Sequence, residues 1–166
     1  LERNFGSDYL NGVLYDTEER ATLVYSESDD YSSYTLEVGS DDNYEKLTNF
    51  IQTLNEMPAG EKGNIESVLD VDSALKYIAA NTVFGNYGSY NGQMAHNYLL
   101  YADSNGYFTI LPWDFNMSFN GFSQGGDATS VSVDNPILGT TTANTPLIQN
   151  LLAVDEYYQA YLSYVE

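Results

Sequence analysis

The chain has 166 residues, no cysteine, and 24 acidic against 5 basic residues, which gives a formal net charge of −19. This length suffices for one domain with its own core. The absence of cysteine excludes disulfides, thiolate nucleophiles and cysteine-ligated zinc, and the charge argues against nucleic acid as a partner. Such a surface suits cations or basic peptides, unless it serves only to keep the protein solvated.

The apolar segments and the overall composition bear on where the protein resides. Residues 1–5 carry neither a basic nor an apolar leader, so we expect the chain to be part of a longer protein. The longest mainly apolar stretch, residues 68–84, is interrupted by charges and too short for a membrane span. Sixteen Tyr among few Lys is a composition that we associate with exported bacterial proteins.

The first third of the chain predicts a small antiparallel meander followed by a helix. Residues 10–15, 21–26 and 34–38 are short β-prone runs separated by polar segments. From Asp41 onward, apolar residues recur every three or four positions, which indicates a helix with one buried face. This helix should end before Pro58. Its apolar face consists of Tyr44, Leu47, Phe50, Ile51 and Leu54.

A buried central helix is predicted in the middle of the chain. After a short helical stretch from Gly63, either Asp70 or Asp72 is placed to cap it. Gly85 supplies the left-handed residue that is typical of helix ends. The apolar face of this helix consists of Val71, Leu75, Ile78, Ala79, Val83 and Phe84.

The second half of the chain predicts a β-hairpin, a long loop and two helices. Residues 97–102 and 107–111 flank the turn sequence Asp-Ser-Asn-Gly and should form the hairpin. Residues 120–144 show no period and should be irregular and less ordered than their flanks. A helix should begin at Pro146 and another after Asp155. The predicted fold class is α+β, mainly helical, with small antiparallel hairpins.

The chemistry-bearing residues gather at one end of the predicted hairpin. Nucleophile-elbow, Walker and dinucleotide motifs are all missing. Asn97 and Asp114 should be neighbours where the first strand begins and the second ends. With Asn116 they offer one carboxylate and two amides, a set suited to magnesium when phosphate oxygens complete its shell. Spacing alone favours structural roles, with His96 and Asn97 satisfying backbone groups and Asp114 forming a turn.

Two segments of the hairpin carry a resemblance to a known family. The sequences H-N-Y-L-L-Y, from His96, and F-T-I-L-P-W-D-F-N-M-S-F, from Phe108, are similar to the signature of the CotH kinase family of spore-coat-type atypical protein kinases. That signature reads H-N-Y-x-L-Y, then (I/L)-P-W-D-x-(D/N)-x-(A/S)-F. Weaker likeness extends over most of the chain. Trp113, inside the signature, is expected to be substantially buried.

The resemblance implies a fold like the larger lobe of a protein kinase, with residues 1–166 as a single domain fragment that lacks the N-terminal part of the full domain. It implies phosphoryl transfer from ATP, with Mg²⁺, to Ser or Thr of coat or cell-surface proteins outside the cell. By position, Asp114 and Asn97 match the metal-binding Asp and Asn. His96 matches an orienting position, and Asn116 completes the expected cofactor-binding set.

One position departs from the family pattern. The family commonly shows N-x-D-S-Y, with the Asp as the expected catalytic residue, whereas this chain has Asn86-Tyr87-Gly88-Ser89-Tyr90. Loss of a general base costs about 10²–10⁴ in rate. Two hypotheses follow: a phosphotransferase, weakened or inactive because of Gly88, and a non-catalytic spore-coat or cell-surface module that uses its acidic, Tyr-rich face for assembly or binding.

Overall fold

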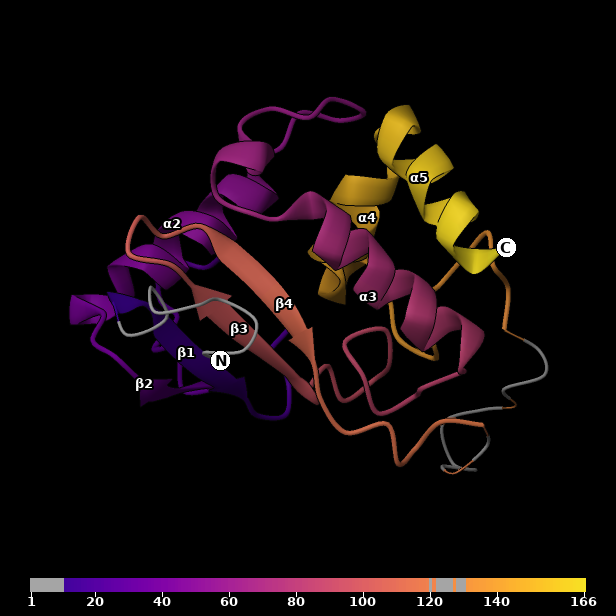
Figure 1. The fold of residues 1–166 in the computed structure, drawn as a ribbon, viewed down its shortest axis with the longest axis horizontal. Helices are drawn as coiled ribbons and strands as arrows, with labels where there is room; N and C mark the ends of the chain where they lie inside the picture. The colour runs from indigo at the N-terminus through magenta and orange to yellow at the C-terminus, as the bar shows by residue number, and fades with distance from the viewer. Residues whose placement is uncertain (1–10, 120, 122–126, 128–130) are drawn as a thin grey trace.

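The computed structural model describes residues 11–119, 121, 127 and 131–166. Within these residues, the strands form one antiparallel sheet in the order β2-β1-β3-β4 (Figure 1). The strands are β1 (Val13–Thr17), β2 (Tyr34–Val38), β3 (Tyr98–Ala102) and β4 (Phe108–Pro112). Strands β3 and β4 form the predicted hairpin, with Tyr98 opposite Pro112 and Ala102 opposite Phe108.

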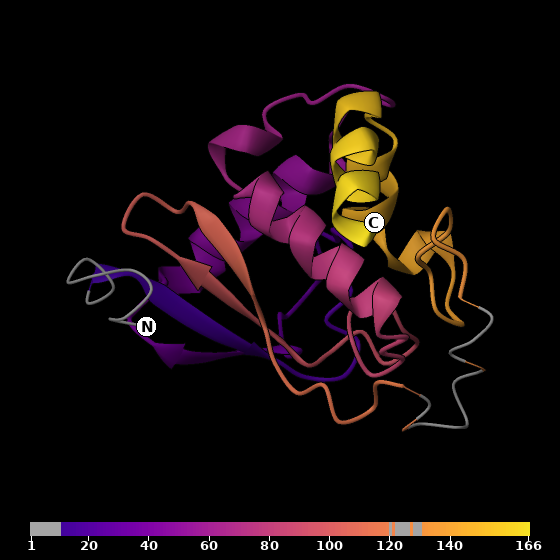
Figure 2. The same cartoon turned by 45° about the vertical axis from the view of Figure 1, so that its right-hand side comes forward.

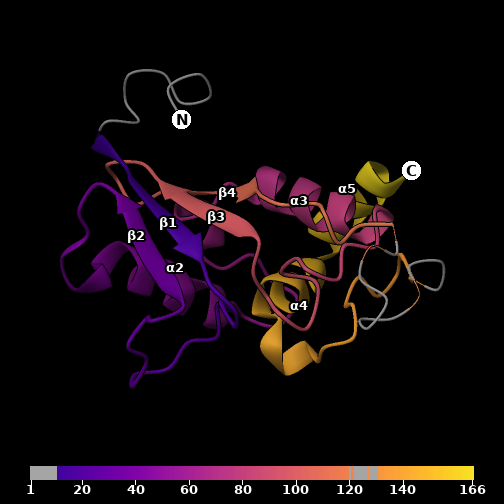
Figure 3. The same ribbon diagram turned by 90° about the horizontal axis from the view of Figure 1, so that it is seen from below.

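One face of the sheet is buried because alternate strand residues point to the same side. Tyr15, Leu100 and Ile110 lie next to one another across β1, β3 and β4, and all are buried. Helix α2 (Glu45–Asn55) covers this face, as Figures 1 and 3 show, and the rings of Phe50 and Phe108 stack with centroids 4.6 Å apart. The buried face of α2 consists of Leu47, Phe50, Ile51 and Leu54, as predicted, whereas Tyr44, the fifth predicted residue, lies before the helix and is only partly buried.

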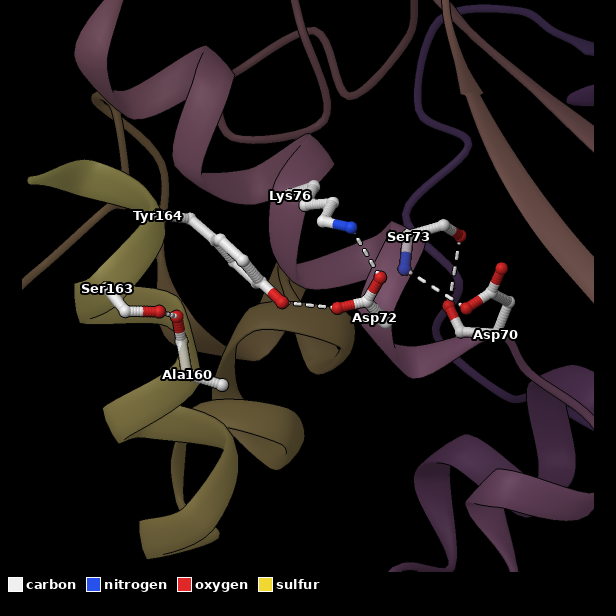
Figure 4. Close-up of polar contacts among 7 residues, drawn as sticks. All are labelled: Asp70, Asp72, Ser73, Lys76, Ala160, Ser163 and Tyr164. Atoms are coloured by element: carbon white, nitrogen blue, oxygen red, sulfur yellow. Dashed lines mark hydrogen bonds and ion pairs between the residues drawn. The ribbon is translucent and has the colours of Figure 1, made fainter.

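The central helix α3 (Val71–Val83) lies between β4 and helix α5 (Asp155–Val165), as Figures 1 and 2 show. Of its two predicted caps the structure uses Asp70, whose carboxylate accepts a hydrogen bond from the Ser73 amide at 3.1 Å. On the exposed side, Asp72 accepts hydrogen bonds from Lys76 and from the Tyr164 hydroxyl (Figure 4). These contacts link α3 to α5.

The remaining helical elements are short. Helix α4 (Pro146–Leu152) begins with proline at its first position, as predicted. The 3-10 turns are η2 (Asp42–Tyr44), η3 (Ile65–Ser67) and η5 (Thr142–Asn144). Among the described residues, no helix combines the length and the apolarity that a bilayer crossing requires.

The predicted strand at residues 21–26 is wrong. Leu23 has φ 59°, in the left-handed region that no strand uses. Its amide donates a hydrogen bond to the Tyr34 hydroxyl at 3.0 Å, and the Ala21 carbonyl accepts one from the Tyr98 hydroxyl. The hydroxyls of buried tyrosines thus make the hydrogen bonds that a neighbouring strand would have made with this segment.

Two further predictions are limited by what the structure shows. The α+β class is confirmed, but mainly helical is not, since helix takes up 35% and strand 17% of the described residues. Within the predicted irregular loop, residues 120, 122–126 and 128–130 lie outside the described residues. The described remainder of that loop contains η5 and isolated bridges such as Ser132 with Asn135.

Candidate functional site

The loop between α3 and β3 is held in place by buried amide side chains. Asn86 is fully buried and donates from Nδ2 to Asn81 Oδ1 of α3 at 2.9 Å. Its own Oδ1 accepts from the Gly88 amide at 3.2 Å. Asn91, also fully buried, donates to Thr82 Oγ1 at 3.2 Å. Side-chain hydrogen bonds to α3 therefore fix the backbone at position 88.

Tyr90 anchors the same loop to distant parts of the chain. Its hydroxyl donates to the Thr22 carbonyl at 2.8 Å and accepts from the Leu147 amide of α4 at 3.1 Å. Its own amide donates to the Tyr77 hydroxyl at 3.2 Å. Burial raises the pKa of Tyr90 well above its usual value, so the phenol stays neutral and keeps its proton for donation.

The structure brings the predicted residues Asn97 and Gly88 together. Asn97 Nδ2 donates to the Gly88 carbonyl at 3.1 Å and lies 3.4 Å from His96 Nε2. Asn97 has φ 58°, a left-handed conformation that asparagine tolerates better than most residues. The NH₂ group of the amide is directed at Gly88, so its oxygen faces a different direction.

Asp114 forms a local turn with Asn116. Its Oδ1 accepts from the Asn116 amide at 3.0 Å and its Oδ2 from Asn116 Nδ2 at 3.1 Å. The carboxylate is exposed, and the strand register places it at the same end of the hairpin as Asn97. The two side chains are nevertheless hydrogen-bonded to different partners, and Asn116 presents its nitrogen to Asp114.

Met117, which the sequence reasoning did not single out, lies against position 88. A Cβ built on Gly88 would be 2.7 Å from Met117 Sδ and 3.3 Å from Asn97 Nδ2. Gly88 is not in the left-handed region, so the backbone itself would accept a side chain. Met117 occupies the room that such a side chain would need. Only the tertiary contact between the two segments reveals this pair.

The prediction that Trp113 is substantially buried is wrong, because the residue is 58% exposed. Strand β4 ends at Pro112, and the core positions of that strand are filled by Phe108 and Ile110. The chain then runs along the C-terminal half of α3 in turns (Figure 1). The exposed signature aromatics Phe115 and Phe119 pack on Phe84, with ring centroids 5.7 and 5.3 Å from it.

The donors at the hairpin end fit a magnesium–phosphate complex better than a bare metal ion. They comprise one carboxylate, Asp114, and the amide of Asn97. The described residues contain no group of three or more His, Asp or Glu side chains placed to hold a metal. Magnesium commonly takes one or two carboxylates and completes its shell with water and phosphate oxygens. A magnesium ion held by these two donors would therefore need phosphate oxygens to complete its shell.

The fold and this site define an α+β domain in which a His-Asn pair precedes one hairpin strand and a Pro-Trp-Asp segment follows the other. The family described as CotH kinase protein matches residues 1–166, so the chain belongs to this family. A curated relative is the inner spore coat protein H of Bacillus subtilis (strain 168), which is 27% identical over 114 residues. The match covers 68% of this chain and 29% of the relative. The matched region thus spans less than a third of that relative's length.

Proposed function

We propose that this chain forms the metal- and phosphate-binding part of a CotH-type, kinase-like domain. Asp114 and Asn97 hold Mg²⁺ together with the phosphates of ATP. His96 orients the Asn97 side chain, and Asn116 orients the Asp114 carboxylate. The observation that supports this best is the convergence at the hairpin end, where Asn97 Nδ2 is 3.1 Å from the Gly88 carbonyl oxygen. The resemblance independently assigns both residues to one site.

Each residue of the proposed site has a defined task. The Asp114 carboxylate supplies the only negative charge among the proposed metal ligands and is held in position by Asn116. The Asn97 amide is fixed by Gly88, which leaves its oxygen to serve as a neutral ligand. ATP with Mg²⁺ would supply the phosphoryl group for transfer to Ser or Thr hydroxyls. No carboxylate stands at position 88 to accept the hydroxyl proton.

The proposed substrates and location rest on the family and on the relative. Inner spore coat protein H is named for the spore coat. We propose that proteins of the spore coat or cell surface are the substrates, and that this chain acts at the same place. A fold like the larger lobe of a protein kinase is part of the same proposal.

A second candidate function is a non-catalytic coat or cell-surface module. The contact between Met117 and position 88 favours it, because an apolar side chain fills the place where the family carries its acid. Such a module would keep the fold and bind a partner, with or without nucleotide.

The proposal predicts that Asp114→Ala abolishes Mg-ATP binding in the longer protein that contains this chain. Without the carboxylate, the remaining amide of Asn97 is too weak to hold a hard cation. Isothermal calorimetry with Mg-ATP measures the loss, and Asp42→Ala, which removes an exposed carboxylate elsewhere, serves as the matched control. Unchanged Mg-ATP affinity in Asp114→Ala would disprove the metal site.

A further inference from the structure

A polar cavity of about 490 Å³ lies beside the loop that leads into β3. Three separate stretches of the chain form its wall: the segment after β1, the loop before β3 and the segment that leads into α4. The lining residues are Arg20, Thr22, Gln93, Ala95, Thr140 and Asn144. Each of them except Ala95 has a side chain that can donate hydrogen bonds.

The cavity lies at the same end of the sheet as the candidate site. Strand β1 ends beside the start of β3. Arg20 follows shortly after β1, and its amide donates a hydrogen bond to the Met94 carbonyl at 2.8 Å. Ala95, in the cavity wall, is two residues before Asn97. The Cα atoms of these two residues are therefore at most about 7 Å apart, so the cavity adjoins the proposed metal ligands.

The polar side chains of the cavity wall form no hydrogen bond or ion pair with any residue that the structure describes. This is unexpected for Arg20, because the chain has 24 acidic residues and two of them directly precede it. By contrast, Lys62 and Lys76 are each paired with carboxylates. A guanidinium has five donors and keeps its charge at any ordinary pH, so Arg20 can bind an anion from outside the chain.

The backbone that carries the cavity donors is held in an uncommon conformation by buried groups. Arg20 and Leu23 have φ 71° and 59°, in the left-handed region. The Thr22 carbonyl accepts from the Tyr90 hydroxyl at 2.8 Å, and the Leu23 amide donates to the Tyr34 hydroxyl at 3.0 Å. Because this backbone is fixed before a ligand binds, less entropy is lost on binding.

A phosphate group fits this wall better than other anions. Arginine binds phosphate through two parallel hydrogen bonds. The hydroxyl and amide donors come from different stretches of the chain, an arrangement that suits a tetrahedral group with three terminal oxygens better than a planar carboxylate. Small-molecule sites are mostly apolar, whereas Ala95 alone is apolar among the lining residues. The wall therefore offers little surface to the base of a nucleotide.

We propose that this cavity binds a phosphorylated Ser or Thr side chain of a protein segment. The net charge of −19 repels free anions, whereas a protein segment can carry basic residues next to its phosphate. The inference rests on the proposed function for its ligand, because phosphorylated Ser or Thr is the product of the proposed transfer. The cavity would hold a segment that has already been phosphorylated next to the transfer site. Phosphate binding itself requires neither Mg²⁺ nor ATP.

The test measures peptide binding to the longer protein that contains this chain, by fluorescence anisotropy. The probe is a labelled peptide of about eight residues with one phosphoserine and two Lys that balance its charge. The same peptide with Ser, and again with Glu, in place of phosphoserine provides the control ligands. EDTA is present and nucleotide is omitted, so that failure of the proposed Mg-ATP site does not affect the result.

Two cavity variants and one matched control locate the site. Arg20→Gln, at an exposed position, removes the guanidinium and should weaken binding at least about tenfold. Thr140→Val removes one hydroxyl donor and should weaken it about fivefold. Lys46→Gln removes the same charge beside Gly106, in the turn at the opposite end of the hairpin, and should leave binding unchanged. Thermal unfolding confirms that each variant is folded.

Each possible result bears on the proposal. Saturable binding of the phosphoserine peptide that is weakened by Arg20→Gln and Thr140→Val, and retained in Lys46→Gln, supports the cavity. Equal binding of either control peptide, equal loss in Lys46→Gln, or no binding at all overturns it. Tighter, Arg20-dependent binding of ADP in the same buffer would assign the cavity to a nucleotide and also overturn it. Peptide binding by a protein that fails to bind Mg-ATP would support the cavity and contradict only the metal site.

Discussion

Position 88 shows how one residue governs what the candidate site can do. Glycine stands where the resemblance places the acid of the family, and the Met117 side chain lies where a side chain at that position would be. The backbone of Gly88 is not left-handed, so an aspartate there is disfavoured by the methionine and not by its own φ angle. Since a methionine side chain is flexible, the obstruction can be removed by substitution.

We predict that Gly88→Asp raises phosphoryl transfer only modestly, and that Gly88→Asp with Met117→Ala raises it much further. A restored general base is worth about 10²–10⁴ in rate when it is correctly placed. The aspartate side chain can take up the correct position only when the Met117 side chain is shortened. Transfer of labelled phosphate to casein by the longer protein measures the effect.

Met117→Ala alone is the control for this pair and should leave transfer at its starting level. Equal transfer rates for Gly88→Asp with and without Met117→Ala would show that Met117 does not block position 88. No transfer in any variant, together with intact Mg-ATP binding, would favour the non-catalytic module.

Among the elements, α3 connects the sheet, the candidate site and the C-terminal helices. Its first turn is capped by Asp70, whose own amide is bonded to Phe108 of β4. Its C-terminal half holds the site loop through Asn81 and Thr82. A substitution that destabilises α3 is therefore expected to destabilise the edge of the sheet and the site loop as well.

We predict that Asp70→Ala lowers the free energy of unfolding by about 1 kcal/mol, the usual cost of a lost N-cap. The substitution keeps the backbone hydrogen bond to Phe108 and removes only the one that Ser73 donates to the carboxylate. Urea denaturation followed by circular dichroism measures the loss.

Asp155→Ala is the matched control, because Asp155 lies in the first turn of α5 but the N-cap there is Val154, without a side-chain hydrogen bond. It removes the same charge and should cost less than Asp70→Ala. Equal losses would mean that helix-dipole or net-charge effects, and not the cap, stabilise α3.

The whole molecule combines an acidic surface with a core rich in buried tyrosine. Burial raises the pKa of the phenols of Tyr34, Tyr77, Tyr90 and Tyr98 above the usual value of 10.0. Each of these groups binds its proton more tightly in the folded chain than in the unfolded chain. Their contribution to stability is therefore complete below pH 10 and is lost progressively as the pH rises above it.

We predict cooperative alkaline unfolding above about pH 10. Phenolate absorbance should rise first from the exposed tyrosines and then in a second step that coincides with loss of the circular dichroism signal. A single, non-cooperative titration of all 16 tyrosines near pH 10, with the fold intact, would contradict the burial of these rings.

Much of the secondary structure and the family could be predicted from the sequence, because these depend on local patterns. The three-and-four period around Phe50 predicted α2, and the Asp-Ser-Asn-Gly turn predicted the β3–β4 hairpin. The segment around Asp114 carried the family signature. Periodicity also suggested a strand at residues 21–26, and there the hydroxyls of Tyr34 and Tyr98 took the hydrogen bonds that a strand would have made.

The sequence by itself determined the α+β class and most of the buried face of α2, and it named the candidate ligands, whereas Val83, which it placed on the buried face of the central helix, is 53% exposed. Only the tertiary structure decided that Trp113 is exposed, that Met117 fills the space at Gly88, and that Asn97 is bonded to that glycine and not to Asp114. The physical reason is range: helix periods and turn sequences act over a few residues, whereas these contacts join segments that are distant in the chain and meet only when the core has packed.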